Sequence, residues 1–190
     1  MGTLRRSFAV FAAATLLATG CGYNTIQTKD EAVNSAGAQI KAQLQRRADL
    51  IPNLVETVKG FARQESTVFI SVAEARSRLN GAVQSGNLQQ MAEANQALTP
   101  ALGRLIAVAE AYPELKSNQN FLDLQNQLEG TENRISVARQ DYNKAVEDFN
   151  AYIRRFPYNL TAKISGHGKP REYFELTTPG AAEAPKVKFN

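Results

Sequence analysis

The stretch that decides the fold is Phe121–Phe156, FLDLQNQLEGTENRISVARQDYNKAVEDFNAYIRRF. Its apolar and small residues recur at alternating steps of three and four, which is the packing pattern of coiled coils and helical bundles. The pattern predicts one long helix with a continuous buried seam. The seam residues are Phe121, Leu124, Leu128, Thr131, Ile135, Ala138, Tyr142, Ala145, Phe149, Tyr152 and Phe156.

Helical spacing also fills the chain before this seam. Thr28 and Glu31 have the form of a capping box, so we expect a helix to begin there. Its apolar stripe (Val33, Ile40, Leu44, Ile51, Leu54, Val58 and Phe61) continues less regularly to Leu79. Turns are expected at Asn80–Gly81 and at Ser85–Asn87. A second helix is predicted from Leu88 to about Ala111, kinked or restarted at Pro100. The inward residues of this helix are expected to be Met91, Leu98, Leu102, Leu105, Val108 and Ala109.

These patterns predict an all-α fold: a bundle of three to four long antiparallel helices with an irregular C-terminal tail. The bundle is expected to span residues 29–164, with a short turn at 158–164, and the tail residues 165–190. Phe156–Pro157 ends the long helix, and the tail is rich in glycine and proline. Two pieces of the tail, 172–176 and 187–189, alternate as short extended segments do.

The N-terminal residues indicate export and lipid anchoring. Arg5 and Arg6 precede an uncharged apolar run from Phe8 to Leu17, and small residues then lead to Cys21, the only cysteine. The run is too short for a membrane span, which needs about 20 apolar residues. It resembles a bacterial lipobox, although Ala18 stands where leucine is usual. We therefore predict a cleaved signal peptide at 1–20, cut between Gly20 and Cys21, and a tether at 21–28.

The resemblance to a lipobox implies that Cys21 is acylated, with palmitate or a similar chain. Gly22 follows, and the absence of Asp there favours the outer membrane in a Gram-negative cell. The alternative is an ordinary export signal with a chance cysteine.

Composition narrows the possible chemistry. The formal charge of +4 falls by two if Arg5 and Arg6 leave with the signal, and charges of both signs are interleaved, so no nucleic-acid partner is expected. With Cys21 acylated, neither a disulfide nor a zinc-thiolate site is possible. His167 is the only histidine, so a histidine-rich metal site or a Ser-His-Asp triad is not expected. We predict no metal and no cofactor.

One polar cluster stands out within the first helical pattern. Pro52 leaves the carbonyl of Ala48 without its helical partner, and Arg47 lies beside the apolar stripe. Such polar groups either form a layer that fixes helix register or offer a recognition surface. The candidate residues are Arg46, Arg47, Asp49, Pro52 and Asn53, joined by Glu132 and Asn133 beside the seam residue Thr131.

Several strings are distinctive of one family: LQRRADLIPNLVETVKG at 44–60, AEAYPELK at 109–116, TENRI at 131–135 and PKVKF at 185–189. Together with Ala138–Arg139, Tyr142–Asn143 and Phe156–Pro157 they resemble the LemA family of bacterial membrane-anchored proteins. The resemblance covers nearly all of 23–189. It implies a mostly helical bundle outside the cytoplasm and no established enzymatic activity.

Three functions are compatible with these features. The first is a non-catalytic, membrane-tethered scaffold or interaction module, whose helix faces bind a protein partner or a second copy. The second is an envelope hydrolase that uses a carboxylate pair, Asp49 with Glu132. The third is a membrane-remodelling protein, although we find no Lys/Arg-rich face with an aromatic opposite side.

Overall fold

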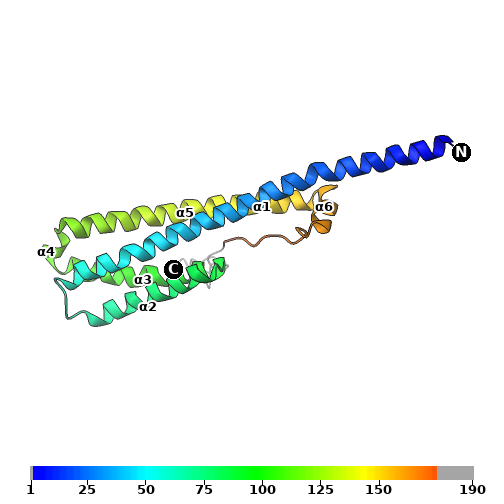
Figure 1. Ribbon diagram of the computed structural model, residues 1–190. Helices are drawn as coiled ribbons and strands as arrows, with labels where there is room; N and C mark the ends of the chain where they lie inside the picture. The colour runs from blue at the N-terminus through cyan, green and yellow to red at the C-terminus, as the bar shows by residue number, and fades with distance from the viewer. Residues whose placement is uncertain (1, 175–190) are drawn as a thin grey trace, which may run out of the picture. The chain divides into compact units, whose positions relative to one another are not determined.

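The computed structural model describes the backbone of residues 2–174 and the side chains of residues 22–174. All regular elements in this part of the chain are helices, so the predicted all-α fold is confirmed (Figure 1). They are α1 (Gly2–Lys59), α2 (Ser66–Ser85), α3 (Leu88–Glu110), α4 (Pro113–Lys116), α5 (Gln119–Arg154) and α6 (Tyr158–Ile164). The chain divides into unit 1, Met1–Ile40 with Val137–Tyr173, and unit 2, Lys41–Ser136 with Phe174–Asn190.

Unit 2 is an antiparallel four-helix bundle. It is built from the second part of α1, from α2 and α3, and from the first part of α5 (Figure 1). Each helix buries the apolar stripe that its spacing predicts, because only that face is excluded from water. The core includes Leu44, Ile51, Leu54, Val58, Val72, Leu79, Leu98, Leu105, Leu128 and Ile135.

The corner between α2 and α3 lies where glycine and asparagine predict it. Gly86 has a φ of 72°, which an L side chain rarely adopts, and ends α2. Asn87 then caps α3, its Oδ1 accepting a hydrogen bond of 3.0 Å from the backbone N–H of Gln90. The other predicted turn, Asn80–Gly81, is wrong, because both residues lie inside α2. Burial of Leu79, Ala82 and Val83 outweighs the cost of one helical glycine, about 1 kcal/mol.

The extent of the first helix differs from the prediction at both ends. It begins at Gly2 rather than at Thr28, whose hydroxyl donates to the carbonyl of Asn24 within α1 instead of capping a new helix. It ends at Lys59, and residues 60–65 turn the chain into α2. The apolar spacing did not reveal that α1 ends at Lys59, because α1 and α2 both bury an apolar stripe in the same core. Phe61, assigned to the stripe, lies in this turn and is 37% exposed.

The N-terminal predictions meet the structure only in part. The predicted tether, residues 21–28, lies within α1. The side chains of the predicted signal peptide (1–20) and of Cys21 lie outside the described residues, so cleavage at Gly20 and lipidation stay predictions. Among the described helices, none combines the length and the apolar character that crossing a bilayer requires.

Helix α5 carries the predicted seam, with one shift. The seam residues from Phe121 to Tyr142 are buried, except that Leu124 is only partly so. Beyond Tyr142, Phe149 is buried as predicted, but Val146 and Ile153 are buried in place of Ala145 and Tyr152, and Phe156 is 80% exposed. The move has a geometric cause, because a straight helix of 3.6 residues per turn drifts against a 3.5-residue repeat.

Unit 1 is built on the first part of α1 and the second part of α5. The two helices approach closely where Gly37 of α1 meets the ring of Tyr142, since a Cβ at Gly37 would lie 3.6 Å from that ring. Helix α6 follows the end of α5, and its predicted short turn at 158–164 is confirmed. Residues 165–173, here termed the strap, then return along α5 without regular secondary structure (Figure 1). The remainder of the predicted tail, 175–190, lies outside the described residues.

Candidate functional site

Arg47 is the centre of a polar network inside unit 2. The residue is only 5% exposed, because its position in α1 falls in the apolar stripe between Leu44 and Ile51. Its guanidinium donates to Oδ1 of Asn95 and, at 3.4 Å, to Oγ1 of Thr99, both on α3. It also forms an ion pair with Glu132 on α5. One side chain of α1 therefore connects α1 to both α3 and α5.

The charge of Arg47 is buried and is paired with a carboxylate in this network. Burial lowers the pKa of Arg47 below its usual value, and the charge and hydrogen bond of Glu132 oppose that shift. Arg47 enters the network as a cation, because a guanidinium is not deprotonated in proteins. Its Nε is buried without a hydrogen-bond partner, so the desolvation of the guanidinium is only partly compensated. The network thus joins three helices through one buried cation.

Pro52 has the consequence that its position in α1 predicts. Proline cannot donate to the carbonyl of Ala48, and that carbonyl is buried with its residue. Arg76 of α2 supplies the missing donor, with Nε 2.8 Å from the oxygen of Ala48. A second arginine thereby connects α2 to α1, and its contact on α1, the carbonyl of Ala48, lies one residue after Arg47.

The structure separates the predicted cluster into two groups. Arg47 and Glu132 meet in the network, and Pro52 is half-buried beside it. The others lie on exposed positions of their helices: Arg46, Asp49, Asn53 and Asn133. The contacts of Arg47 fit a polar layer, while a recognition role for the exposed group stays a prediction.

The carboxylate pair that a hydrolase needs is not formed by Asp49 and Glu132. Asp49 is exposed and accepts a hydrogen bond of 2.9 Å from Gln45, on its own helix. Glu132 is half-exposed, at 48%, and binds Arg47 instead. Glycosidase chemistry requires two carboxyl groups that flank one bond, so this pair does not support that alternative. Among the described side chains, no group of three His, Cys, Asp or Glu residues could hold a metal ion.

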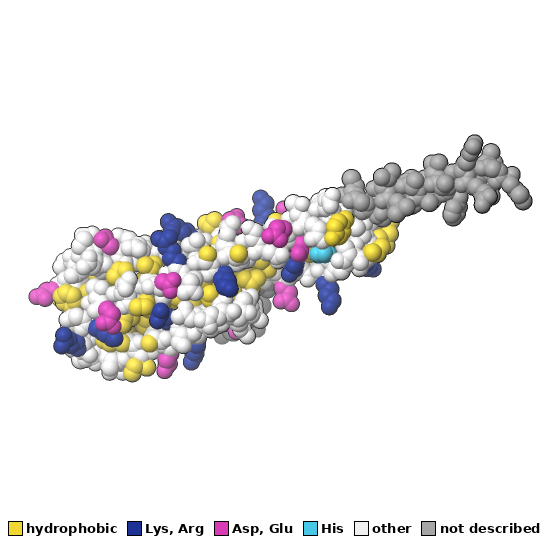
Figure 2. Space-filling view, viewed as in Figure 1, with side chains coloured by type: hydrophobic (Ala, Val, Ile, Leu, Met, Phe, Trp, Pro, Cys, Tyr) yellow, Lys and Arg dark blue, Asp and Glu magenta, His cyan; other side chains and the backbone are white. Residues whose placement is uncertain are grey.

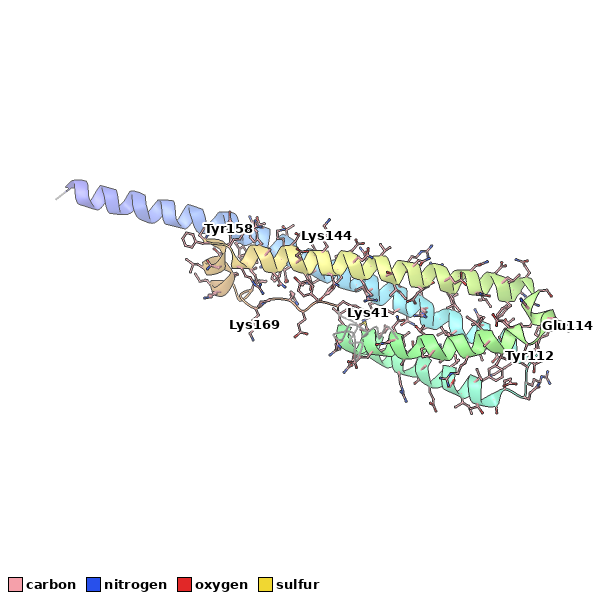
Figure 3. The ribbon with its side chains drawn as sticks, turned by 180° about the vertical axis from the view of Figure 1, so that it is seen from behind. Lys41, Tyr112, Glu114, Lys144, Tyr158 and Lys169 are labelled. Atoms are coloured by element: carbon pink, nitrogen blue, oxygen red, sulfur yellow. The ribbon has the colours of Figure 1, made fainter. Side chains whose placement is uncertain are left out.

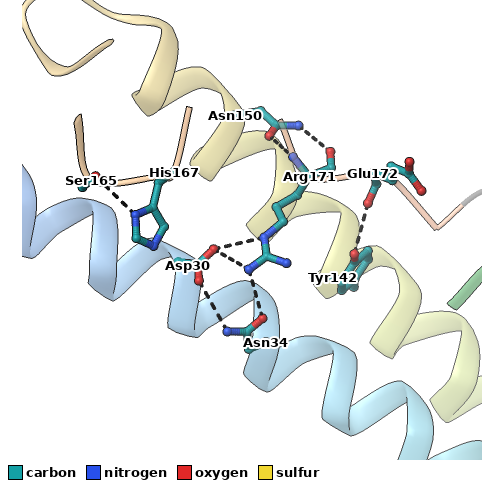
Figure 4. Close-up of polar contacts among 8 residues, drawn as sticks. All are labelled: Asp30, Asn34, Tyr142, Asn150, Ser165, His167, Arg171 and Glu172. Atoms are coloured by element: carbon teal, nitrogen blue, oxygen red, sulfur yellow. Dashed lines mark hydrogen bonds and ion pairs between the residues drawn. The ribbon is translucent and has the colours of Figure 1, made fainter. Parts of the chain in front are cut away.

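A second polar cluster, missed in the sequence, holds the strap in unit 1 (Figure 4). Arg171 donates to Oδ1 of Asp30 from Nε (3.0 Å) and from Nη2 (2.7 Å), and Nη2 also reaches Asn34 at 3.5 Å. Asn150, which is 5% exposed, binds the backbone of the same residue in both directions. It accepts from the N–H of Arg171 at 2.8 Å and donates to its carbonyl at 2.9 Å.

Tyr142 and His167 complete the contacts of the strap. The hydroxyl of Tyr142 donates to the carbonyl of Glu172 over 3.1 Å, and burial raises the pKa of Tyr142 above its usual 10.0. His167, the only histidine, is half-buried, with Nδ1 3.2 Å from Oγ of Ser165. The sequence did hold one signal for this cluster: Asn150 lies four residues after Val146 and three before Ile153, so it falls on the helix face that these two residues bury.

Unit 2 also contains an open hollow of about 670 Å³ at the corner of α1 and α2. Its lining mixes charge with apolar surface. Lys59 binds Glu56 at 2.9 Å and lies 5.8 Å from the ring centre of Phe69. Arg63 and the exposed Ile70 complete one side.

Comparisons with known sequences found a family model and several relatives. A sequence model described as the LemA family matches residues 36–189. Magnetosome protein MamQ 2 of Paramagnetospirillum magneticum is 30% identical over 83% of this chain and 66% of its own length. Magnetosome protein MamQ of Magnetospirillum gryphiswaldense is 27% identical over the same shares. Protein LemA of Metamycoplasma hominis is 21% identical over 74% of this chain and 63% of its own.

The chain therefore spans slightly less than two thirds of the length of these relatives. The family match nonetheless covers most of the chain, including the helices that carry Arg47, Glu132 and Asn150. The resemblance drawn from the sequence motifs is confirmed, and the chain belongs to the LemA family.

Proposed function

We propose that this chain is a lipid-anchored, non-catalytic helical scaffold of the bacterial envelope, lying on the extracytoplasmic side of a membrane. The observation that carries the proposal is the continuity between the predicted anchor and the core. Cys21 ends the signal-like run, and α1 continues through it into the helix that supplies Ile40, Leu44 and Arg47 to the packed interior. A tether at Cys21 would hold the start of unit 1 at the membrane.

The placement of charged groups supports a scaffold rather than an enzyme. Arg47 binds Glu132 between helices, and Arg171 of the strap binds Asp30. The carboxylates considered for hydrolysis bind other partners. Long exposed helix faces are left to bind a protein or a second copy of the chain, and tethering would raise the effective concentration of such partners.

The names of relatives support a membrane setting. Both MamQ relatives are named as magnetosome proteins, and the family match covers residues 36–189 of this chain. Because the alignment covers 66% of their length, their specific roles are not transferred.

Lipidation is tested first by metabolic labelling with a palmitate analogue. We expect label on the wild-type chain, loss of label in Cys21→Ser, and release of that variant from the membrane fraction. Separation of inner and outer membranes tests the preference for the outer membrane indicated by Gly22. Equal membrane retention of both proteins without label would exclude the lipid anchor.

The scaffold role is tested by crosslinking the membrane-resident protein in its own cells and identifying the captured proteins. The surface variant combines Arg46→Ala, Asp49→Ala and Asn53→Ala, all at exposed or half-exposed positions of α1. The matched control removes one cation, one carboxylate and one amide from exposed positions of α3: Arg104→Ala, Glu110→Ala and Gln96→Ala. A specific partner lost only in the first variant would support the α1 surface. Turnover of an envelope substrate by the purified protein, abolished by a point mutation, would contradict the proposal.

A further inference from the structure

Unit 1 exposes large apolar side chains where α5 passes into α6. Ile164 is 85% exposed, Phe156 80% and Leu160 52%, which makes the first two the most exposed of the large hydrophobic residues described. Leu160 and Ile164 are four residues apart and share one face of α6. Figure 2 shows hydrophobic side chains gathered at this end of unit 1. Single exposed hydrophobic residues are ordinary, whereas a group of three in one place marks a contact surface.

The same part of the chain is purely cationic. Residues 149–170 contain no Asp or Glu, while Arg154, Arg155, Lys163 and Lys169 are all exposed. None of these four forms an ion pair with a side chain that the structure describes. Residues 22–29 of α1 also lack carboxylates. A basic face beside apolar residues was not found in the sequence, because Phe156 was assigned to the buried seam. The exposure of Phe156 corrects that interpretation.

The cationic and apolar residues are held next to the start of the predicted anchor. Gly22, one residue after Cys21, packs against Tyr158, since a Cβ at Gly22 would lie 2.6 Å from the Tyr158 ring. Tyr158 in turn stacks on Tyr152 of α5, with ring centres 4.4 Å apart. Figure 3 shows Tyr158 beside α1 at this point. An anchor at Cys21 would therefore place α6 at the membrane surface.

We propose that this surface is a second membrane contact, which inserts its apolar side chains into the interface of an anionic bilayer. We term it the α6 tip and define it as Phe156, Leu160 and Ile164 with Arg154, Arg155 and Lys163. The proposal rests on the membrane tether of the proposed function and deepens it. Anionic headgroups complement the unpaired cations, and the acyl boundary covers the apolar face. A lipid anchor and a basic patch together supply the two signals that stable attachment takes.

The absence of tryptophan from the chain allows a direct test. Ile164→Trp introduces a single fluorophore at the tip, and the full chain is reconstituted in phosphatidylglycerol–phosphatidylcholine vesicles with brominated acyl chains. We expect blue-shifted emission and strong quenching. The control, Val137→Trp, is also in unit 1 and replaces a residue that is 56% exposed. It lies about 26 Å before the end of α5 at 1.5 Å per residue, so it should stay unquenched.

Charge reversal tests the electrostatic part. Arg154→Glu, Arg155→Glu and Lys163→Glu are combined with Ile164→Trp. Each cation at an anionic surface contributes about fivefold, so the loss of three cations alone should weaken docking of the tip roughly 100-fold, and the three added carboxylates should weaken it further. The control reverses three exposed cations elsewhere, Lys116, Arg134 and Lys144, and should keep the quenching. Pure phosphatidylcholine vesicles should lower the quenching of the unreversed protein.

Cosedimentation with the vesicles separates the tip from the tether. An Ile164→Trp chain that sediments while its fluorophore stays unquenched would overturn the tip and leave the tether intact. A chain that does not sediment would overturn both. Equal quenching at positions 164 and 137 would also overturn the tip, since the contact would not be specific to α6. Emission that shifts to the blue without vesicles as protein concentration rises would assign the face to a second copy of the chain instead.

Discussion

Arg47 in unit 2 and Arg171 in unit 1 use the same chemistry in opposite settings. Each guanidinium binds one carboxylate and one amide oxygen: Arg47 binds Glu132 and Asn95, and Arg171 binds Asp30 and Asn34. The Arg47 side chain is 6% exposed and joins three helices, whereas Arg171 is 43% exposed and holds a strap without regular structure. The difference teaches that burial, rather than the list of partners, decides what an arginine contributes.

The physical reason lies in solvation. Taking a guanidinium out of water is costly, and the contacts of Arg47 offset part of that cost. Removing Arg47 or one of its partners therefore leaves a buried polar group without its partner. Arg171 stays close to water and salt, which screen its attraction to Asp30. The backbone contacts of Asn150, rather than the charge of Arg171, are therefore expected to hold most of the strap.

The largest effect is expected at Arg47. Arg47→Ala should lower the free energy of unfolding by about 3 kcal/mol, since it removes buried packing and leaves Asn95 without its partner. Arg47→Met keeps the volume and removes the charge, so it should cost less than half as much. Urea unfolding followed by circular dichroism measures both. Equal losses in the two variants would show that the polar network, and not the packing, carries the contribution.

A smaller effect is expected at Asn150. Asn150→Ala removes two hydrogen bonds to the backbone of Arg171 and should destabilise unit 1 by about 2 kcal/mol. Trypsin should then cut faster after Arg171, because the strap detaches. Asn126→Ala, at an exposed position of the same helix, is the control and should change neither quantity. Unchanged cleavage in Asn150→Ala would mean that the strap is held elsewhere.

The next effect is pH-dependent and belongs to Tyr142. Its folded pKa is raised above the ordinary 10.0, so its contribution is complete below pH 10 and is lost as pH rises through the folded value. Tyr142→Phe should cost about 1 kcal/mol at pH 7 through the lost bond to Glu172. Above pH 10, the free energy of unfolding should therefore fall less steeply in the variant than in the unchanged protein. Parallel stability curves for both proteins between pH 9 and 11 (the range that brackets the usual tyrosine pKa) would contradict this.

The smallest effect is expected at Arg171. Arg171→Ala should cost about 0.5 kcal/mol in low salt, as exposed ion pairs do, and almost nothing at about 1 M salt. The effect of Arg47→Ala should persist at both salt concentrations, because its site is largely closed to ions. Measuring the two variants in parallel sharpens the comparison, and a salt-independent loss at Arg171 would break it.

Much of the helical architecture could be predicted from local pattern. The seam of α5, the apolar stripe of α1 and the corner at Gly86 were predicted because periodicity and turn chemistry act over a few residues. The break at residues 60–65 could not be predicted in this way, since the apolar stripes of α1 and α2 continue in phase. The burial of Ile153 in place of Tyr152 likewise depends on the accumulated drift of a long straight helix.

Local sequence established which faces are apolar, where Arg47 interrupts the apolar stripe and Pro52 the helical hydrogen bonds, and which family the chain resembles. Only the tertiary structure decided what those groups bind. Arg76 donates a hydrogen bond to the carbonyl of Ala48, 28 residues away in the sequence, and Arg171 donates to Asp30, 141 residues away in the sequence. Periodicity predicts which face is buried, but three-dimensional packing decides which group pairs with a buried polar atom. The reason is that the free-energy cost of an unmade hydrogen bond depends on which groups exclude water from that atom.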